Sequence, residues 1–292
     1  MEFKTEISQN NDVKIDDQFI GKINGLKLEL DLKKGALETD IKSLKKAARQ
    51  TIGPELEKRV QTIIDTGLIE LKDDFKIYWN NFPIAILTTG SDYLNPNFDL
   101  IIDDIINQNT RQKLNEYINK WIGIKINNVL KSLIDLKNIK EKNSSIKALA
   151  YQLYENNGVL KREQVTEYLN NLEQSERKIL RDLGVKFGRY HVFLYQLIKP
   201  EAVTLRTLLW KNFHKKFHNL KPPTFGLNFL EYKETNNKSF MLLCGFEKFE
   251  NFFVRIDILE RLFVLIINSS SKGNTEIKLV PEMLNLLGCS KD

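Results

Sequence analysis

The sequence contains only two cysteines, Cys244 and Cys289, among 292 residues. Two thiols cannot build a disulfide framework or a four-cysteine zinc site, so a reducing compartment is expected. Long hydrophobic runs are also missing, because the longest, such as residues 262–267, are far too short to cross a bilayer. Residues 1–10 mix acids and bases and lack the apolar segment of a secretory signal. We therefore expect a cytoplasmic protein that has no membrane partner.

The motifs of common enzyme classes are absent as well. There is no GxxxxGK[ST] loop and no DExH or DExD box, which excludes a Walker-type phosphate loop and the magnesium-binding carboxylates of a helicase motor. There is no GxSxG nucleophile elbow either. We therefore predict that this chain alone is not an enzyme, has no catalytic residues and carries no cofactor.

Histidine is scarce, and His191, His214 and His218 all lie in one basic region. His214 and His218 have the i, i+4 spacing of a metal-binding pair, but no HExxH or CxxC motif accompanies them. Two surface histidines among lysines are the favoured interpretation, so no metal site is predicted. A metal-dependent enzyme at this pair is the least favoured function.

Hydrophobic residues at 42% and charged residues at 28% are typical of a folded protein. Lysine and arginine exceed aspartate and glutamate by 44 to 38, which gives a net charge of +6. This excess permits contact with a polyanion. Lysine, asparagine and isoleucine are also the residues that AT-rich codon usage favours, so a merely solvated basic surface explains the charge equally well.

Periodicity and turn residues divide the chain into three expected modules. Residues 1–140 should hold β-hairpins, around residues 19–32 and 68–90, and long helices, one of which is divided at Gly53 and Pro54. Residues 141–220 should form a helical basic module that follows a polar linker. Residues 221–292 should form a small α+β module that is truncated at its C-terminus, with strands expected at residues 240–244 and within residues 272–280 and a last helix that ends at Gly288. In the helix expected at residues 256–267, Asp257 and Arg261 have the i, i+4 spacing of an ion pair, within a charge cluster that includes Glu260.

The predicted fold class is mainly α with small β elements, in the α+β sense. Three short helices at residues 146–155, 162–170 and 174–183, followed by a β-prone segment, favour a helical bundle. An ordinary bundle and a winged-helix-like bundle would both give this pattern. Short β-hairpins are expected on either side of it.

The densest combination of basic charge, turn residues and large apolar side chains lies at residues 177–210. A basic amphipathic helix ends at Gly184, a β-prone piece with Gly188 follows, and Pro200 begins a further amphipathic helix. LGVKFG at residues 183–188 and LIKP at residues 197–200 resemble a segment of the bacterial helicase-related proteins, relatives of the mitochondrial degradosome RNA helicase in superfamily two.

Further segments resemble the same family in the same order. They are GKINGLKLELD (residues 21–31) with KSLKKAARQ (42–50), FKIYW (75–79) with FPIA (82–85), GF (245–246), VRIDILERL (254–262) and LLGCS (286–290). The resemblance implies the region that follows the two helicase motor domains, which are absent here. ATP and magnesium are therefore implied only for the motor of the parent helicase. The chain is expected to be a fragment or remnant of such a protein.

The leading functional hypothesis is an accessory C-terminal region of an ATP-dependent RNA or DNA helicase. It would bind single-stranded RNA or DNA, or brace motor domains in cis or in trans. The candidate backbone contacts are the basic residues Arg177, Lys178, Arg181, Lys186, Arg189, Lys199, Arg206, Lys211, Lys215 and Lys216.

The candidate stacking partners are the aromatic residues Phe187, Tyr190, Phe213 and Phe217. Each of them is also a candidate core residue, because aromatic side chains are commonly buried. The alternative function is a helical protein-interaction scaffold that docks a helicase or nuclease partner. It predicts concentration-dependent association without nucleic-acid binding.

Overall fold

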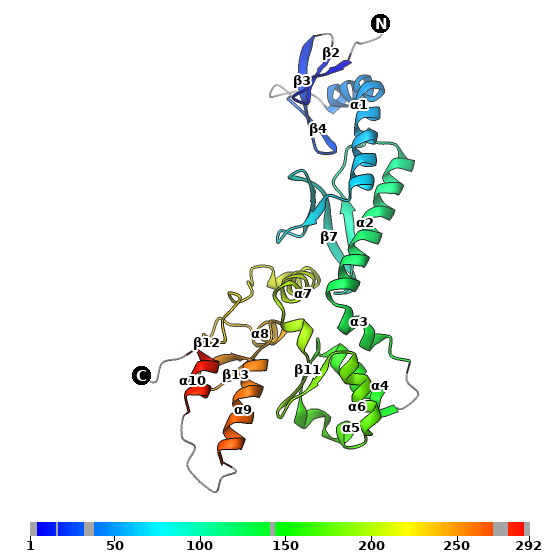
Figure 1. Cartoon of the computed structure of the whole chain (residues 1–292). Coiled ribbons are helices and arrows are strands. Elements are labelled where there is room, and N and C mark those ends of the chain that lie inside the picture. The colour runs from blue at the N-terminus through cyan, green and yellow to red at the C-terminus, as the bar shows by residue number, and fades with distance from the viewer. Residues whose placement is uncertain (1–4, 16, 32–37, 141–143, 271–279, 289–292) are drawn as a thin grey trace. The chain divides into compact units, whose positions relative to one another are not determined.

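The computed structural model describes residues 5–15, 17–31, 38–140, 144–270 and 280–288 (Figure 1). Contacts within the chain divide it into two compact units, Met1–Ile124 and Lys125–Asp292. The three modules expected from the sequence, with boundaries near residues 140 and 220, stay a prediction.

The first unit begins with a four-stranded antiparallel sheet in which neighbours in sequence are neighbours in the sheet. Its strands are β1 (Thr5–Ile7), β2 (Asp12–Ile15), β3 (Gln18–Asn24) and β4 (Lys27–Leu30). Val13, Ile23 and Leu26 are fully buried and form the centre of its core. A second sheet of the same order contains β5 (Ile69–Leu71), β6 (Lys76–Trp79), β7 (Phe82–Asp92) and β8 (Asn95–Leu100).

Helix α1 (Glu38–Thr66) is continuous and includes Pro54 in its interior. The sequence predicted two helices here, and this prediction is wrong. Proline removes a helical hydrogen bond, but Ile52, Leu56 and Val60 on either side of it are almost completely buried. Burial of this apolar stripe offsets the local cost, because tertiary packing contributes more to helix stability than propensity does. Helix α2 (Gln108–Val129) follows the second sheet.

The second unit contains a group of helices beside a three-stranded antiparallel sheet. Its elements are α3 (Lys131–Lys137), α4 (Ser144–Glu155), β9 (Val159–Lys161), the 3-10 helix η1 (Arg162–Val165), α5 (Thr166–Asn170), α6 (Gln174–Asp182), β10 (Val185–Phe187) and β11 (His191–Leu194). The sheet order is β10-β11-β9. Val185 and Val192 are fully buried, as are Leu149 and Leu153 of α4.

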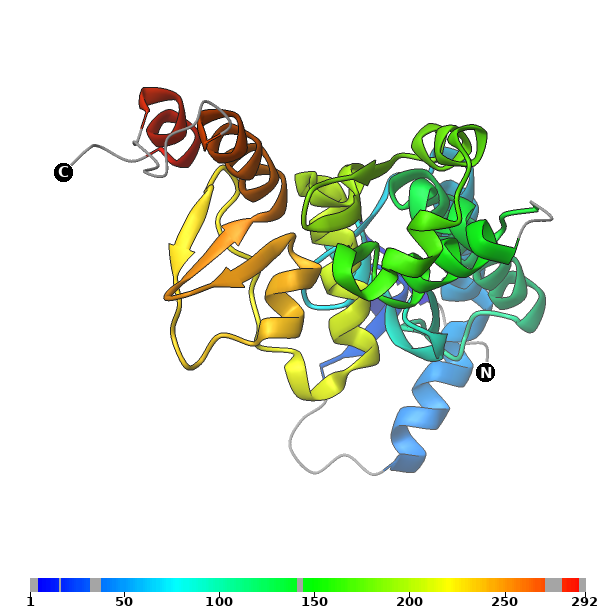
Figure 2. The same ribbon diagram turned by 90° about the horizontal axis from the view of Figure 1, so that it is seen from below.

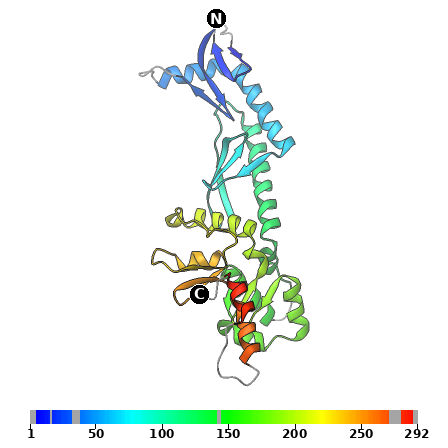
Figure 3. The ribbon, with the colours of Figure 1, turned by 60° about the vertical axis from the view of Figure 1, so that its left-hand side comes forward.

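The rest of the second unit forms a further three-stranded sheet and its covering helices. Its elements are η2 (Tyr195–Ile198), α7 (Pro200–Phe213), η3 (Lys215–Phe217), β12 (Phe229–Glu231), α8 (Lys238–Leu243), β13 (Phe246–Phe249), β14 (Phe252–Arg255), α9 (Ile256–Ser270) and α10 (Pro281–Leu287). The sheet order is β12-β14-β13. Helices α9 and α10 lie side by side (Figure 2), and α7 packs against α8 (Figure 3).

The predicted fold class is wrong in its emphasis on a helical bundle. Among the residues that the structure describes, helices make up 50% and strands 25%, so sheet is a main component. In the described part of the chain the strands form four antiparallel sheets, and helices accompany sheets in both units. The fold is α+β. Strands such as β9, β10 and β12 have only three residues, too few for an alternating pattern to be recognised in the sequence.

One further local prediction differs from the structure. Residues 240–244 were expected to form a strand, but α8 covers most of them, and the side chain of Asn237 caps this helix by accepting the N–H of Phe240 at 2.9 Å. The last helix, α10, ends at Gly288 as predicted, with a left-handed φ of 74° at the glycine. The strand expected between residues 272 and 280 lies largely outside the described residues.

Candidate nucleic-acid interface

Helices α5 and α6 are joined by a short turn at residues 171–173. Buried Leu169 and Leu172 anchor this turn in the core. The guanidinium group of Arg177 donates to the carbonyls of Leu169 at 2.7 Å and Leu172 at 3.4 Å. Arg177 was predicted to contact a nucleic-acid backbone, but these bonds give it a structural role in closing the turn.

Helix α6 buries Leu180 in the core and leaves basic side chains exposed on its surface. Lys178 and Arg181 are exposed, and their i, i+3 spacing makes them neighbours on the helix surface. The Arg181 guanidinium lies 5.7 Å from the ring centroid of Phe187 in β10. The structure therefore brings together three of the predicted residues at the junction of α6 and β10.

Strands β10 and β11 form a hairpin whose turn is made by Gly188, Arg189 and Tyr190. The side chains of Arg189 and Tyr190 are exposed at this turn. Lys186 is exposed too. Because side chains alternate along a strand, that of Lys186 lies on the face of β10 opposite to the face that carries Val185 and Phe187.

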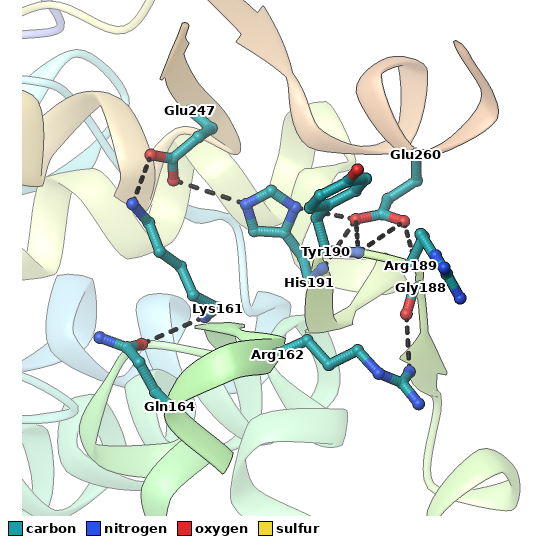
Figure 4. Close-up of polar contacts among 9 residues, drawn as sticks. All are labelled: Lys161, Arg162, Gln164, Gly188, Arg189, Tyr190, His191, Glu247 and Glu260. Atoms are coloured by element: carbon teal, nitrogen blue, oxygen red, sulfur yellow. Dashed lines mark hydrogen bonds and ion pairs between the residues drawn. The ribbon is translucent and has the colours of Figure 1, made fainter. Parts of the chain in front are cut away.

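The hairpin turn is held by a single carboxylate from α9. The buried side chain of Glu260 accepts the backbone N–H groups of Arg189, of Tyr190 at 3.0 Å and of His191 at 2.7 Å (Figure 4). Gly188 is required beside it, because an added Cβ would collide with Glu260 and lie 2.8 Å from the His191 carbonyl. Arg162 donates to the Gly188 carbonyl at 2.8 Å and ties the turn to η1.

His191 connects this carboxylate to a second one (Figure 4). Its Nδ1–H donates to Glu260 Oε1 at 2.9 Å, while its Nε2 lies 3.6 Å from Glu247 Oε2 in β13. Lys161 Nζ lies 3.5 Å from the other oxygen of Glu247. The row Lys161–Glu247–His191–Glu260 alternates in charge when the imidazole is protonated, and it joins the β9-β10-β11 sheet to β13 and α9.

The pKa values of these groups favour that charged state. Burial lowers the pKa of His191, but hydrogen bonds and charges from Glu247 and Glu260 raise it by more, so it lies above its ordinary value. Burial raises the pKa of Glu260, but the His191 bond and the backbone N–H bonds lower it by more. For Glu247 the bond to His191 and the charge of Lys161 likewise exceed the effect of burial, and its pKa is lowered.

Two predicted phosphate contacts are buried and do not fit that role. Arg206 is 1% exposed and donates to the carbonyls of Asn157 at 2.7 Å, Leu197 at 3.0 Å and Leu243. Lys211 is 7% exposed, and its ammonium group donates to the Leu220 carbonyl at 3.1 Å. The sequence could not reveal this, because α7 is buried on nearly all sides and its basic residues follow no polar stripe.

The remaining predicted residues lie around α7. Lys199 precedes the helix and is exposed, as are Lys215 and Lys216 in η3. Phe217 stacks on Trp210, with 4.9 Å between ring centroids, and Phe213 packs edge-on against His214 at 5.1 Å. Both phenylalanines therefore already have aromatic partners within the protein. His214 also packs against Trp210, at 4.6 Å.

Sequence reasoning missed the roles of His191, Glu247 and Glu260. Glu260 was noticed only as part of a charge cluster in which Asp257 and Arg261 were expected to pair. Instead, Arg255 donates to both carboxylate oxygens of Asp257, at 2.6 and 3.1 Å. Spacing along one helix cannot reveal the partner of Glu260, because His191 is 69 residues away.

Within the residues described, no group of three or more His, Cys, Asp or Glu side chains could hold a metal ion. None of the helices among these residues is both long and apolar enough to span a bilayer. Comparison with known proteins found no matching family model, no matching curated protein and no matching solved structure.

Proposed function

We propose that the second unit binds single-stranded RNA or DNA through α6 and the β10–β11 hairpin. In this proposal the chain is an accessory region of an ATP-dependent superfamily-two helicase, which guides a strand or braces the motor domains and performs no chemistry itself. The supporting observation is the set of exposed cations Lys178, Arg181 and Arg189 on two adjacent elements. The hairpin among them is fixed by buried hydrogen bonds to Glu260.

Such an arrangement suits backbone recognition. Exposed lysine and arginine side chains displace counterions from phosphates, and this electrostatic contribution supplies most of the affinity in binding that does not read sequence. A turn held by Glu260 keeps Arg189 in place before a strand arrives, so less conformational entropy is lost on binding. The helicase context is supported only by the ordered sequence resemblance described above.

The proposal is tested by fluorescence anisotropy with a labelled single-stranded oligonucleotide, measured over a range of salt concentrations. The double variant Lys178→Gln with Arg181→Gln should bind more weakly. Its log–log salt slope should be smaller by about 0.7 for each phosphate that the variant no longer neutralises. The matched control is Lys113→Gln with Lys120→Gln, which removes the same charge from exposed positions of α2 and should retain the wild-type slope.

Two results would contradict the proposal. One is the absence of any anisotropy change with wild-type chain at low salt, and the other is an equal loss of affinity in the control. If the chain does not bind nucleic acid but associates in sedimentation velocity experiments, the alternative scaffold function is supported. The exposed apolar side chains Phe249, Phe252 and Val264 are the observation that favours this alternative.

A further inference from the structure

A cavity of about 420 Å³ lies beside the hairpin turn in the second unit. Its lining comes from β9 and η1, from the turn between β10 and β11, from β13 and from α9. Neither the sequence resemblance nor the backbone contacts proposed above assign a role to this cavity. Its volume falls within the range of about 300–1,000 Å³ that is typical of small-molecule sites.

One side of the cavity is aromatic. The rings of Tyr190 and Phe263 have centroids 3.9 Å apart, and Phe249 meets Phe263 edge-on at 6.4 Å. Tyr190 is nevertheless 48% exposed and Phe249 49% exposed. Two large apolar rings thus remain half open to solvent at the cavity, where a flat partner can stack on them.

The cavity is also lined by an excess of positive charge. Lys161, Arg162 and Arg189 contribute three cations, against the two carboxylates of Glu163 and Glu247. Lys248 also lies at the cavity, but its ammonium group donates to the Glu250 carbonyl at 2.9 Å and lies over the Tyr232 ring. Glu247 is already matched by Lys161 at 3.5 Å and by the ring of His191 at 3.6 Å. The electrostatic environment of the cavity therefore favours an anion, while its aromatic side favours a planar ring.

We propose that this cavity binds one unstacked nucleotide, with its base against Tyr190 and Phe249 and its phosphate near Arg162 and Arg189. The inference rests on the proposed nucleic-acid binding, since the nucleotide would belong to the strand held by α6 and the hairpin. A single strand can supply such a base, because its bases are free to leave the stack and to pack on aromatic side chains. A purely apolar ligand would leave Arg162 and Arg189 without an anionic partner from the ligand, and a simple anion would leave the aromatic rings exposed.

Glu260 acts here as a positioning residue. It binds the backbone N–H groups of Arg189 and Tyr190, so one carboxylate orients both the cation and the aromatic ring that the nucleotide would contact. Gly188 cannot be replaced without moving this turn. The site is therefore built on fixed backbone, as binding sites with defined geometry require.

The experiment uses the full chain and a single-stranded oligonucleotide that contains one 2-aminopurine, whose fluorescence falls when it stacks on an aromatic ring. We expect quenching with wild-type protein and with Tyr190→Phe, which retains the ring. Tyr190→Ala should abolish the quenching and weaken binding by about 5- to 150-fold, as expected for the loss of one stacked base. Tyr151→Ala, at an exposed position of α4 outside the cavity, is the control and should behave as wild type.

Two further ligands, an abasic strand and a free mononucleotide, distinguish a nucleotide within a strand from a free nucleotide. They also distinguish failure of the cavity proposal from failure of the proposed strand binding. An abasic strand of equal length should bind wild type and Tyr190→Ala equally, and it should still respond to the Lys178 and Arg181 substitutions. If the oligonucleotide binds but its 2-aminopurine is not quenched, and Tyr190→Ala binds as wild type, the cavity proposal is overturned while strand binding stands.

The last measurement is binding of a free mononucleotide to wild type and to Tyr190→Ala. Tyr190-dependent binding of the mononucleotide without strand binding supports the nucleotide site and overturns the proposed function. The absence of binding to any of these ligands overturns both proposals. Thermal unfolding of Tyr190→Ala shows whether removal of the ring that packs on Phe263 disturbs the fold. If Tyr190→Ala is misfolded, Tyr190→Phe still tests the proposal, because this variant keeps the ring and unquenched 2-aminopurine fluorescence with it would contradict the nucleotide site.

Discussion

The Nδ1–H of His191 donates to Oε1 of Glu260 at 2.9 Å, although the two residues are 69 positions apart in the sequence. This bond, with the backbone N–H bonds to the same carboxylate, connects the β10–β11 hairpin to α9. Because the hairpin carries Arg189 and Tyr190, the geometry of the candidate nucleic-acid interface depends on this connection.

The first prediction concerns the pH dependence of folding stability. The pKa of His191 is raised above its ordinary 6.5, so its contribution is fully present below pH 6.5 and is lost as the pH rises through the folded-state value. The pKa of Glu260 is lowered below its ordinary 4.5, so its contribution is present above pH 4.5 and is lost as the pH falls through the folded-state value.

Thermal unfolding of wild type and His191→Gln at a series of pH values checks this. The difference in stability between the two proteins should be largest between about pH 4.5 and 6.5, the interval set by the two ordinary values. It should shrink as the pH rises from 6.5 through the raised folded-state pKa of His191, because the imidazole of the folded protein then loses its proton. A difference that stays constant across the whole range would show that the charge of His191 contributes nothing.

The second prediction concerns Glu260 itself. Glu260→Gln keeps one acceptor oxygen but loses the negative charge, and we expect it to lower the free energy of unfolding by about 1–3 kcal/mol. Glu260→Ala leaves the turn N–H groups and the His191 ring without their acceptor, and about 3–5 kcal/mol should be lost.

Urea denaturation measures both changes. Glu167→Gln, at an exposed position of α5, is the matched control and should remain within about 0.5 kcal/mol of wild type. If Glu260→Ala were no more harmful than this control, the buried bonds to the hairpin turn would not be stabilising the fold.

A third prediction compares two glycines. In Gly188→Ala the new methyl group would collide with Glu260 and lie 2.8 Å from the His191 carbonyl, so the turn must shift. We expect a loss of stability of about 1–3 kcal/mol, the usual cost of inserting a methyl group where there is no space. In Gly123→Ala the methyl group meets nothing within 4 Å, and it lies inside helix α2, so stability should rise by up to about 1 kcal/mol. Calorimetry of both variants tests this, and a stable Gly188→Ala protein would contradict the close packing of the turn.

The sequence allowed prediction of features that depend on local rules. The exposed basic face of α6 follows from helical periodicity, and the ends of α6 and α10 follow from Gly184 and Gly288. The His191–Glu260 bond does not follow from any local rule, because its partners lie on elements that only the tertiary fold brings together. The cavity beside the hairpin turn depends on the same junction between β13, α9 and the hairpin, so it could not be predicted either.

Arg206 illustrates the same limit and gives the last prediction. Its sequence neighbourhood suggested a phosphate contact, but its guanidinium bonds the carbonyls of Asn157, Leu197 and Leu243 in the interior. Arg206→Met should therefore lower the free energy of unfolding by about 3–5 kcal/mol, because these carbonyls lose a charged donor. Arg181→Met, at an exposed position, should leave stability within about 0.5 kcal/mol of wild type.

The two substitutions should have the opposite order of effect on nucleic-acid binding, where Arg181→Met matters and Arg206→Met does not. Arg181→Met should reduce the salt dependence of oligonucleotide binding, because one phosphate is then no longer neutralised by the protein. Arg206→Met, measured at a temperature where it is still folded, should keep the wild-type salt slope, since its side chain is only 1% exposed. A reduced slope for a folded Arg206→Met protein would mean that this arginine reaches the nucleic acid after all, and that α7 must open when a strand binds.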